Sequence, residues 1–178
     1  TLEENGNATF VGNVNGLAIT TTATSNIGLG STAVDSITTG DYNVGIGDNA
    51  LTAATTGYRN VAIGHDSSKA ITTGFGNTAL GHSSLQTAIT NQGNTAIGYK
   101  SLTINVADNN TGVGYETFLV NTSGSQSVGV GYRVLKANTT GGYNTGLGYQ
   151  ALIANTTGDY NTAVGNSALV ANTTGIYN

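Results

Sequence analysis

The chain has 178 residues, of which 8% are charged, and its formal net charge is −4. Its five Lys and Arg residues cannot neutralise a run of phosphates, so we expect no nucleic-acid partner. No apolar stretch approaches the roughly 20 residues that cross a bilayer, and the first residues lack the pattern of a signal peptide, so we expect no membrane insertion. The absence of cysteine excludes disulfides and thiolate metal sites.

Large apolar residues are scarce. Leu, Ile, Val and Phe make up about a fifth of the chain, close to the level at which disorder becomes common. The few charges and the lack of proline are not typical of a disordered chain. We therefore expect order to come from a small number of apolar residues placed at regular intervals.

Residues 1–25 show no clear repeat, and we expect them to form a degenerate lead-in or an N-terminal cap. Residues 26–178 consist of a repeat in which Asn is followed four residues later by Gly, with a period of 17 residues and one unit of 16. We number the positions of each unit from 1 to 17. The nine units begin at Asn26, Asn43, Asn60, Asn77, Asn94, Asn110, Ser127, Asn144 and Asn161, and Asn178 opens the next.

Two positions of the repeat favour glycine. Position 15 is Gly in seven units, and our alignment puts Asn91 and Asp108 there in the other two; since these residue types tolerate left-handed backbone, we predict a left-handed turn. Position 5 is always Gly, which indicates a positive φ or a very close second backbone. These predicted structural glycines are Gly30, Gly47, Gly64, Gly81, Gly98, Gly114, Gly131, Gly148 and Gly165.

Apolar residues recur at two further positions. Position 4 is always Ile, Leu or Val, as in Ile46 and Leu80, and position 9 is mostly Leu, as in Leu51 and Leu85. We expect both to point inward. Position 3 is only Gly or Ala, so we expect a close neighbouring wall there.

Anchors five residues apart, with glycines between them, do not form a helical stripe. Short strands between turns fit better, so the sequence predicts an all-β fold in which each unit is one coil of a parallel β-solenoid. Nine coils about 4.8 Å apart would make a rod roughly 40 Å long. Asn residues at positions 1 and 12 would then form hydrogen-bonded ladders along the axis.

A coil of this size encloses little apolar surface compared with the cost of ordering its backbone. We therefore expect chains to associate, with closed cyclic symmetry and with close contact at the Gly and Ala of positions 3 and 5. The number of chains does not follow from the repeat.

The units NVAIG, NTALG and NTAIGYKSL resemble the repeats in the heads of trimeric autotransporter adhesins. The longer form NTAVGxxALxxNTTGxYN and the lead-in GNATFVGNVNG are more similar to bacteriophage tail-fibre proteins. The resemblance covers residues 26–178 strongly and residues 1–25 weakly. It implies a left-handed β-roll, a homotrimer that is intertwined or side by side, and a role in host recognition.

Position 6 carries the candidate site. Tyr residues occupy it in four successive units, where they could stack on sugars of a host polysaccharide or form a stabilising ladder between strands. They are Tyr99, Tyr115, Tyr132 and Tyr149. His65 and His82, with Asp48, precede them in the same column, but no second column of ligands accompanies them, and we predict no metal or other cofactor.

The Asp and Glu residues show no repeated pairing, so we expect no enzyme activity. Our first hypothesis is a structural and adhesive rod segment of a phage tail fibre in the virion, with other virion tail proteins and a host polysaccharide or protein receptor as partners. An adhesin head on a bacterial surface is the second. Thr pairs at positions 13 and 14 suggest a third, an ice-binding solenoid, although Ile89 and Val106 interrupt the array.

Overall fold

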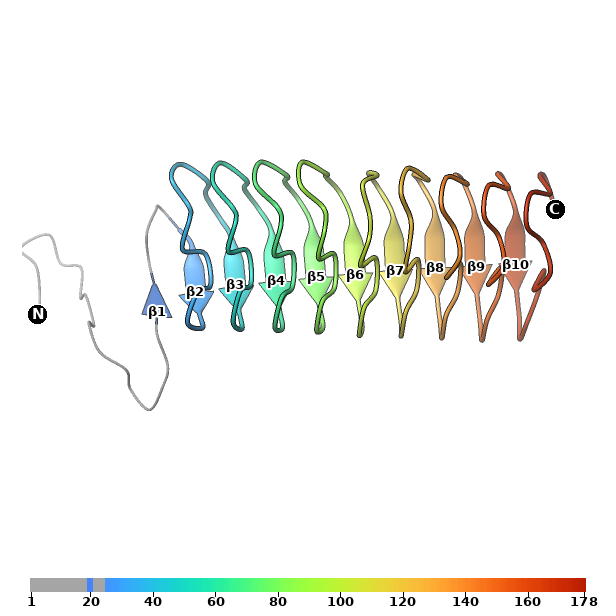
Figure 1. Ribbon diagram of the computed structural model, residues 1–178, viewed down its shortest axis with the longest axis horizontal. Helices are drawn as coiled ribbons and strands as arrows, with labels where there is room; N and C mark the ends of the chain where they lie inside the picture. The colour runs from blue at the N-terminus through green and yellow to red at the C-terminus, as the bar shows by residue number, and fades with distance from the viewer. Residues whose placement is uncertain (1–18, 21–24) are drawn as a thin grey trace, which may run out of the picture.

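A computed structural model describes residues 19–20 and 25–178, so most of the expected lead-in, 1–25, lies outside the described residues. The described chain is an all-β solenoid whose coils follow one another along the long axis (Figure 1). This confirms the predicted fold class and the stacking of units of about 17 residues. Each coil contributes one short strand and returns through turns to the start of the next.

The strands form one ten-stranded sheet in which spatial order equals chain order. Nine strands, β2 to β10, are parallel and paired in register, so that Ala62 lies opposite Ala79 and Ile63 opposite Leu80. β1 pairs with β2 in the antiparallel sense and covers the first edge of the sheet. The strands are β1 Ile19–Thr20, β2 Ile27–Leu29, β3 Val44–Ile46, β4 Val61–Ile63, β5 Thr78–Leu80, β6 Thr95–Ile97, β7 Thr111–Val113, β8 Val128–Val130, β9 Thr145–Leu147 and β10 Thr162–Val164.

In eight of the nine coils, a buried Asn at position 1 closes the coil and joins it to the next. Asn60 Nδ2 donates to the carbonyl of Gly74, at position 15 of its own coil (2.8 Å). Asn60 Oδ1 accepts the backbone N–H of Asn77, the first residue of the following coil (3.0 Å). Where Ser127 replaces Asn, its hydroxyl oxygen still accepts the N–H of Asn144 (3.0 Å). One amide side chain therefore sets both the closure and the register of the repeat.

A second amide ladder at position 12 runs through the C-terminal half of the rod. Each Nδ2 donates to the Oδ1 of the preceding Asn, as from Asn138 to Asn121 (2.9 Å), and to the position-15 carbonyl of its own coil. In the first four coils the same position is apolar: Ile37, Ala54, Ile71 and Ala88. The ladder predicted at position 12 is confirmed for Asn105, Asn121, Asn138, Asn155 and Asn172.

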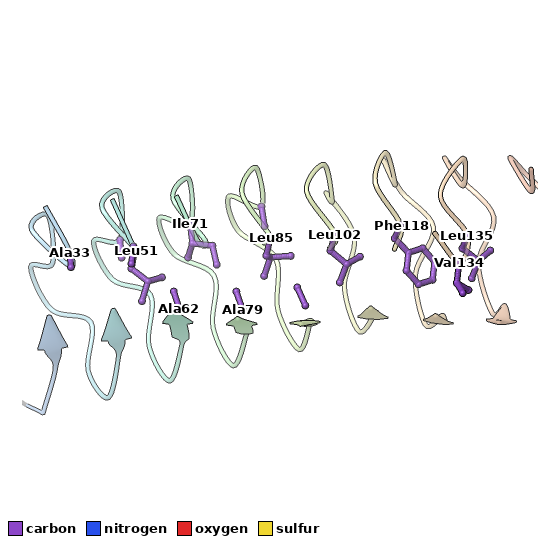
Figure 2. Packing of buried hydrophobic residues seen from close by; sticks show 14 of the residues in the cluster. Ala33, Leu51, Ala62, Ile71, Ala79, Leu85, Leu102, Phe118, Val134 and Leu135 are labelled. Carbon is purple, nitrogen blue, oxygen red and sulfur yellow. The ribbon is translucent and has the colours of Figure 1, made fainter. Parts of the chain in front are cut away.

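The narrow interior is filled from positions 3, 8, 9 and 12. Leu51, Leu85 and Leu102 at position 9 are fully buried, as predicted, and face the small residues of the strands (Figure 2). A Cβ at Gly45, in position 3, would lie 2.9 Å from Val34 Cγ1. The expected close wall is thus the chain's own core.

The prediction that position 4 points inward is wrong. Side chains alternate along a strand, and because position 3 is the buried one, positions 2 and 4 both face outward. Position 3 therefore cannot provide the chain-to-chain contact expected for it. We call positions 2 and 4 of β2 to β10 the outward strand face.

Position 5 requires glycine for both of the expected reasons. Gly64 has φ +129°, which L side chains rarely adopt, and a Cβ there would lie 2.6 Å from the carbonyl oxygen of Gly81 in the next coil. These glycines touch the next coil of the same chain, which by itself accounts for the need for glycine. The contact between chains expected at position 5 stays a prediction.

At position 15 the left-handed turn is wrong, because none of its residues has a positive φ. Glycine is favoured there by a close approach: a Cβ at Gly57 would lie 2.7 Å from the carbonyl oxygen of Gly74. Asp108 was also misaligned. Asn94 closes its coil on the carbonyl of Ala107, so the residue missing from the 16-residue unit precedes Ala107, and Asp108 falls at position 16.

Besides the position-5 glycines, the residues with a positive φ lie at positions 7, 9 and 17, and most of these are not glycine. Leu51, Leu85 and Leu102 have φ between 49° and 54°. Each such residue costs roughly 1–2 kcal/mol, a cost that the hydrogen bonds between coils must offset. The sharp bends of the coil are held by packing and hydrogen bonding, because their residue types alone do not favour them.

Substitution of Gly64 by Ala tests the contact between coils at position 5. We expect Gly64→Ala to lower the free energy of unfolding by about 3 kcal/mol or more, since it combines a disfavoured φ with a backbone clash. Gly76→Ala is the matched control: its φ is +65° and no atom lies within 4 Å of the added Cβ, so it should cost only about 1 kcal/mol. Urea unfolding followed by circular dichroism measures both, and equal losses would contradict the close approach.

Ser68 and Ile71 have complementary sizes within one coil: the first is smaller and the second larger than the equivalent residues of the neighbouring coils. Ser68 occupies the buried position 9 that Leu51 and Leu85 fill in the neighbouring coils, and its hydroxyl has no hydrogen-bond partner. Ile71, at position 12, stands where those coils have Ala, so its larger side chain occupies space that Ser68 leaves. We expect Ile71→Ala alone to cost about 2–4 kcal/mol of unfolding free energy because it leaves a cavity.

The double variant Ser68→Leu with Ile71→Ala reproduces the pairing of the adjacent coils and should recover most of that loss. Thermal or urea unfolding of the natural chain, of the two single variants Ser68→Leu and Ile71→Ala, and of the double variant gives a double-mutant cycle that measures the coupling. Additive effects of the two substitutions would show that the side chains do not share one volume.

Candidate functional site

Six aromatic rings at position 6 form one continuous stack along the rod. The Tyr115 and Tyr132 ring centroids are 5.4 Å apart, and those of Tyr132 and Tyr149 are 5.1 Å apart with an interplanar angle of 7°. The in-register coils impose this arrangement, because each ring occupies position 6 of its coil and so lies over the equivalent ring of the neighbouring coil. We call the stack the ring ladder: His65, His82, Tyr99, Tyr115, Tyr132 and Tyr149.

The ring ladder offers its edges to a ligand. Each internal ring has a neighbouring ring on both faces, so its faces are not free to stack on sugars. Tyr99, Tyr115 and Tyr149 nevertheless remain 40–49% exposed. The accessible groups are therefore ring edges and phenol hydroxyls, repeated once per coil, which are suited to hydrogen bonding with a hydroxylated ligand.

The two His residues at the N-terminal end of the ladder stack on each other, with centroids 5.2 Å apart. Asp48 is occupied by Ser31: hydrogen bonds from the Ser31 backbone N–H and hydroxyl hold the pKa of its carboxyl below the usual range. His65 lies beside Asp66 (3.5 Å). In the described part of the chain, no three His, Asp or Glu residues are grouped so that they could hold a metal ion.

Basic side chains lie on the C-terminal half of the ladder. Lys100 Nζ is 5.3 Å from the Tyr99 ring centroid, and the Arg133 guanidinium carbon is 5.0 Å from that of Tyr132. Glu116 lies between Arg133 and Lys136 and pairs with both at 2.9 Å. The Lys136 hydrogen bond lowers the pKa of Glu116, burial opposes this, and Arg133 adds to the lowering. Burial and the Glu116 charge raise the pKa of Tyr115.

Two shorter ring stacks lie at the end of the repeat. Tyr143, Tyr160 and Tyr177 at position 17 stack with centroids 4.8 and 5.0 Å apart. At position 16, Tyr58 stacks on Phe75 at 4.8 Å. Stacking is thus general wherever aromatic residues share a column, and it stabilises neighbouring coils independently of any ligand.

The Thr pairs are split between two roles. At position 13 the hydroxyl donates to the position-13 carbonyl of the next coil, as from Thr139 to Thr156 (3.0 Å). Position 14 keeps an exposed hydroxyl, as in Thr56 and Thr140. The position-13 hydroxyls, which form one of the two rows expected for an ice-binding surface, are therefore used as donors in hydrogen bonds within the rod.

The outward strand face is the surface that sequence reasoning missed. Its position 4 is Ile, Leu or Val in every coil, whereas its position 2 is Thr in five of the nine strands. Leu80, Leu147 and Val164 at position 4 are 42%, 46% and 65% exposed. The available signal was the alternation of side chains in a strand: once position 3 was assigned to a close wall, positions 2 and 4 had to face the other way.

Comparison with protein-family models, with curated proteins and with solved structures finds no match to this chain. In residues 19–20 and 25–178, no helix has the length and hydropathy that a membrane crossing needs. Function must therefore be argued from the fold, the ring ladder and the outward strand face.

The pairing of Glu116 predicts a pH-dependent contribution to stability. Because the folded pKa lies below the unfolded value near 4.5, the contribution is present above that pH and is lost as the pH falls through the folded pKa. We expect the unfolding free energy of the natural chain to exceed that of Glu116→Gln by about 1 kcal/mol or less at neutral pH. As the pH falls below 4.5 and through the folded pKa, the two should converge. A gap that is constant with pH in urea titrations would contradict this.

Proposed function

We propose that the chain is a rigid structural and adhesive rod segment of a phage tail fibre, which positions and contributes to a host-binding surface in the virion. The observation that carries the proposal is the strict register of nine parallel strands. Such a rod is lengthened by adding coils without redesign of the existing ones, which suits a protein that must span a distance and repeat a contact. The resemblance of the repeat to tail-fibre units supports the same role.

The outward strand face is the surface through which the rod associates. Large apolar side chains are exposed on it from Ile27 at one end to Val164 at the other. Monomeric soluble proteins rarely expose a long row of large apolar side chains, and a closed symmetric assembly would bury it. The proposed number of three chains comes from the resemblance.

Receptor contact is assigned to the ring ladder. Its hydroxyls recur with every coil, so they can contact a repeating polymer at several points, and several weak contacts add to a useful affinity. The receptor is a host cell-surface polysaccharide or protein. The adhesin-head alternative uses the same rod and the same surfaces.

Sedimentation of the purified chain tests the association. We expect association, because an isolated rod would leave the outward strand face in water, and we expect a mass of three chains from the resemblance. Leu80→Glu, on that face, should shift the mass toward one chain, since it places a charge in an apolar interface. Thr90→Glu, on an exposed turn of the same coil, is the control and should sediment as the natural chain does. A folded natural monomer would contradict the association.

Binding of labelled chain to a panel of bacterial cells and their purified surface polysaccharides tests the adhesive role. The triple variant Tyr99→Phe, Tyr115→Phe, Tyr132→Phe keeps the stacked rings and removes the hydroxyls, and it should lose most binding. The matched triple Tyr143→Phe, Tyr160→Phe, Tyr177→Phe alters the other stack and should bind as the natural chain does. The proposal fails if no cell or polysaccharide is bound, or if both triples lose binding equally.

A further inference from the structure

Charge is unevenly distributed around the rod. Between Tyr99 and Lys136 the chain has three basic residues, Lys100, Arg133 and Lys136, and two acidic residues, Asp108 and Glu116. Asp108 belongs to position 16, on the stretch that leads into the next strand, and its carboxylate accepts hydrogen bonds from the backbone and side chain of Gln92. The basic residues, in contrast, border the ring ladder at positions 7 and 10.

Lys100 brings an uncompensated charge to the ladder. Its ammonium lies 5.3 Å from the centroid of Tyr99, and it is not a member of any ion pair among residues 25–178. A cation above a ring is attracted by the ring's negative face, which holds the ammonium near the ladder.

Arg133 is held at the ladder by two contacts. Its guanidinium lies 5.0 Å from the Tyr132 centroid and 5.9 Å from that of Tyr115, while its Nε donates to Glu116 at 2.9 Å. The Glu116 carboxylate, only 13% exposed, is shared with Lys136. Since one carboxylate balances one of two cations, this group keeps a net positive charge, and Arg133 and Lys136 remain about one-third exposed.

Lys100 and Arg133 occupy the same position two coils apart, which is about 10 Å along the axis. Glu116 stands between them in the same column and is paired with Arg133 and Lys136. The Tyr hydroxyls run beside this column, one per coil. Equivalent residues of successive coils lie about 4.8 Å apart, which is comparable to the length of one pyranose unit in an extended chain. A polymer lying along the rod can therefore place sugar hydroxyls against successive Tyr edges and an acidic group near each cation.

We infer that the ladder from Tyr99 to Tyr149 binds a linear anionic polysaccharide parallel to the rod axis, with its carboxylates near Lys100 and Arg133. This rests on the adhesive function proposed above and names its ligand class. Regular hydroxyls favour a polymer of sugars over an acidic protein segment, whose side chains offer charge without a hydroxyl on every unit.

The test compares three polymers on the natural chain at low and physiological ionic strength. Polygalacturonate supplies the linear acidic glycan, its methyl ester supplies the same glycan without charge, and polyglutamate supplies charge without sugar. Polygalacturonate should bind best, its ester at least about fivefold more weakly, and salt should weaken the acidic polymer selectively. Equal binding of the ester, or equal or tighter binding of polyglutamate, overturns the inference.

Lys100→Gln should weaken polygalacturonate binding about twofold to fivefold. Arg59→Gln is the matched control, because it also removes a cation beside a Tyr ring, 5.7 Å from the Tyr58 centroid, but at position 17 of another coil. Equal losses in the two variants would mean non-specific attraction and overturn the inference.

The two proposals fail separately. If host cells are bound through the Tyr hydroxyls while polygalacturonate is not, the anionic ligand is wrong and the adhesive rod stands. If neither cells nor any of the polymers are bound, both are wrong.

Discussion

The fold depends on a buried amide at the first position of eight of its nine coils. The position-1 Asn donates to a carbonyl at the end of its own coil and accepts the first N–H of the next, as Asn60 does with Gly74 and Asn77. Removing such a side chain would leave buried backbone groups unpaired, at about 1–3 kcal/mol for each group. A repeated polar contact, more than apolar burial, therefore keeps the coils closed and in register. This explains how a chain with few large apolar residues can be ordered.

Register in turn creates every column of equivalent residues along the rod. Because equivalent residues lie one above another, Gly at position 5 allows backbones to approach, and apolar residues at positions 3, 8, 9 and 12 form one core. Aromatic residues stack wherever they share a column. The same register places Lys100 and Arg133 on one line with the Tyr hydroxyls. A single coil would have neither a core nor a binding surface, so stability and the proposed adhesion both arise from repetition.

The sequence was sufficient to predict the solenoid, the two Asn ladders, the buried Leu column and the need for glycine at position 5. The prediction failed where residue type alone does not show which way a side chain points or where a residue is missing. Ile46 and Leu80 were predicted to be core residues because they are apolar, yet they stand next to a buried Gly or Ala on a strand and so face outward. Asp108 was misaligned because a missing residue can be placed at several points of a turn, and only the Asn94 to Ala107 hydrogen bond locates it. The left-handed backbone at Leu85 is imposed by packing and has no residue signature.

Distances between coils report on the in-register stacking itself. The chain has no cysteine, so pairs of spin labels can be introduced at exposed position-14 threonines and measured by pulsed electron paramagnetic resonance in samples diluted with unlabelled chain. Labels at Thr56 and Thr140, five coils apart, should give a narrow distribution centred near about 24 Å, and labels at Thr39 and Thr157, seven coils apart, near about 34 Å. Distances that do not grow in proportion to the number of coils, or broad distributions for both pairs, would contradict the in-register rod.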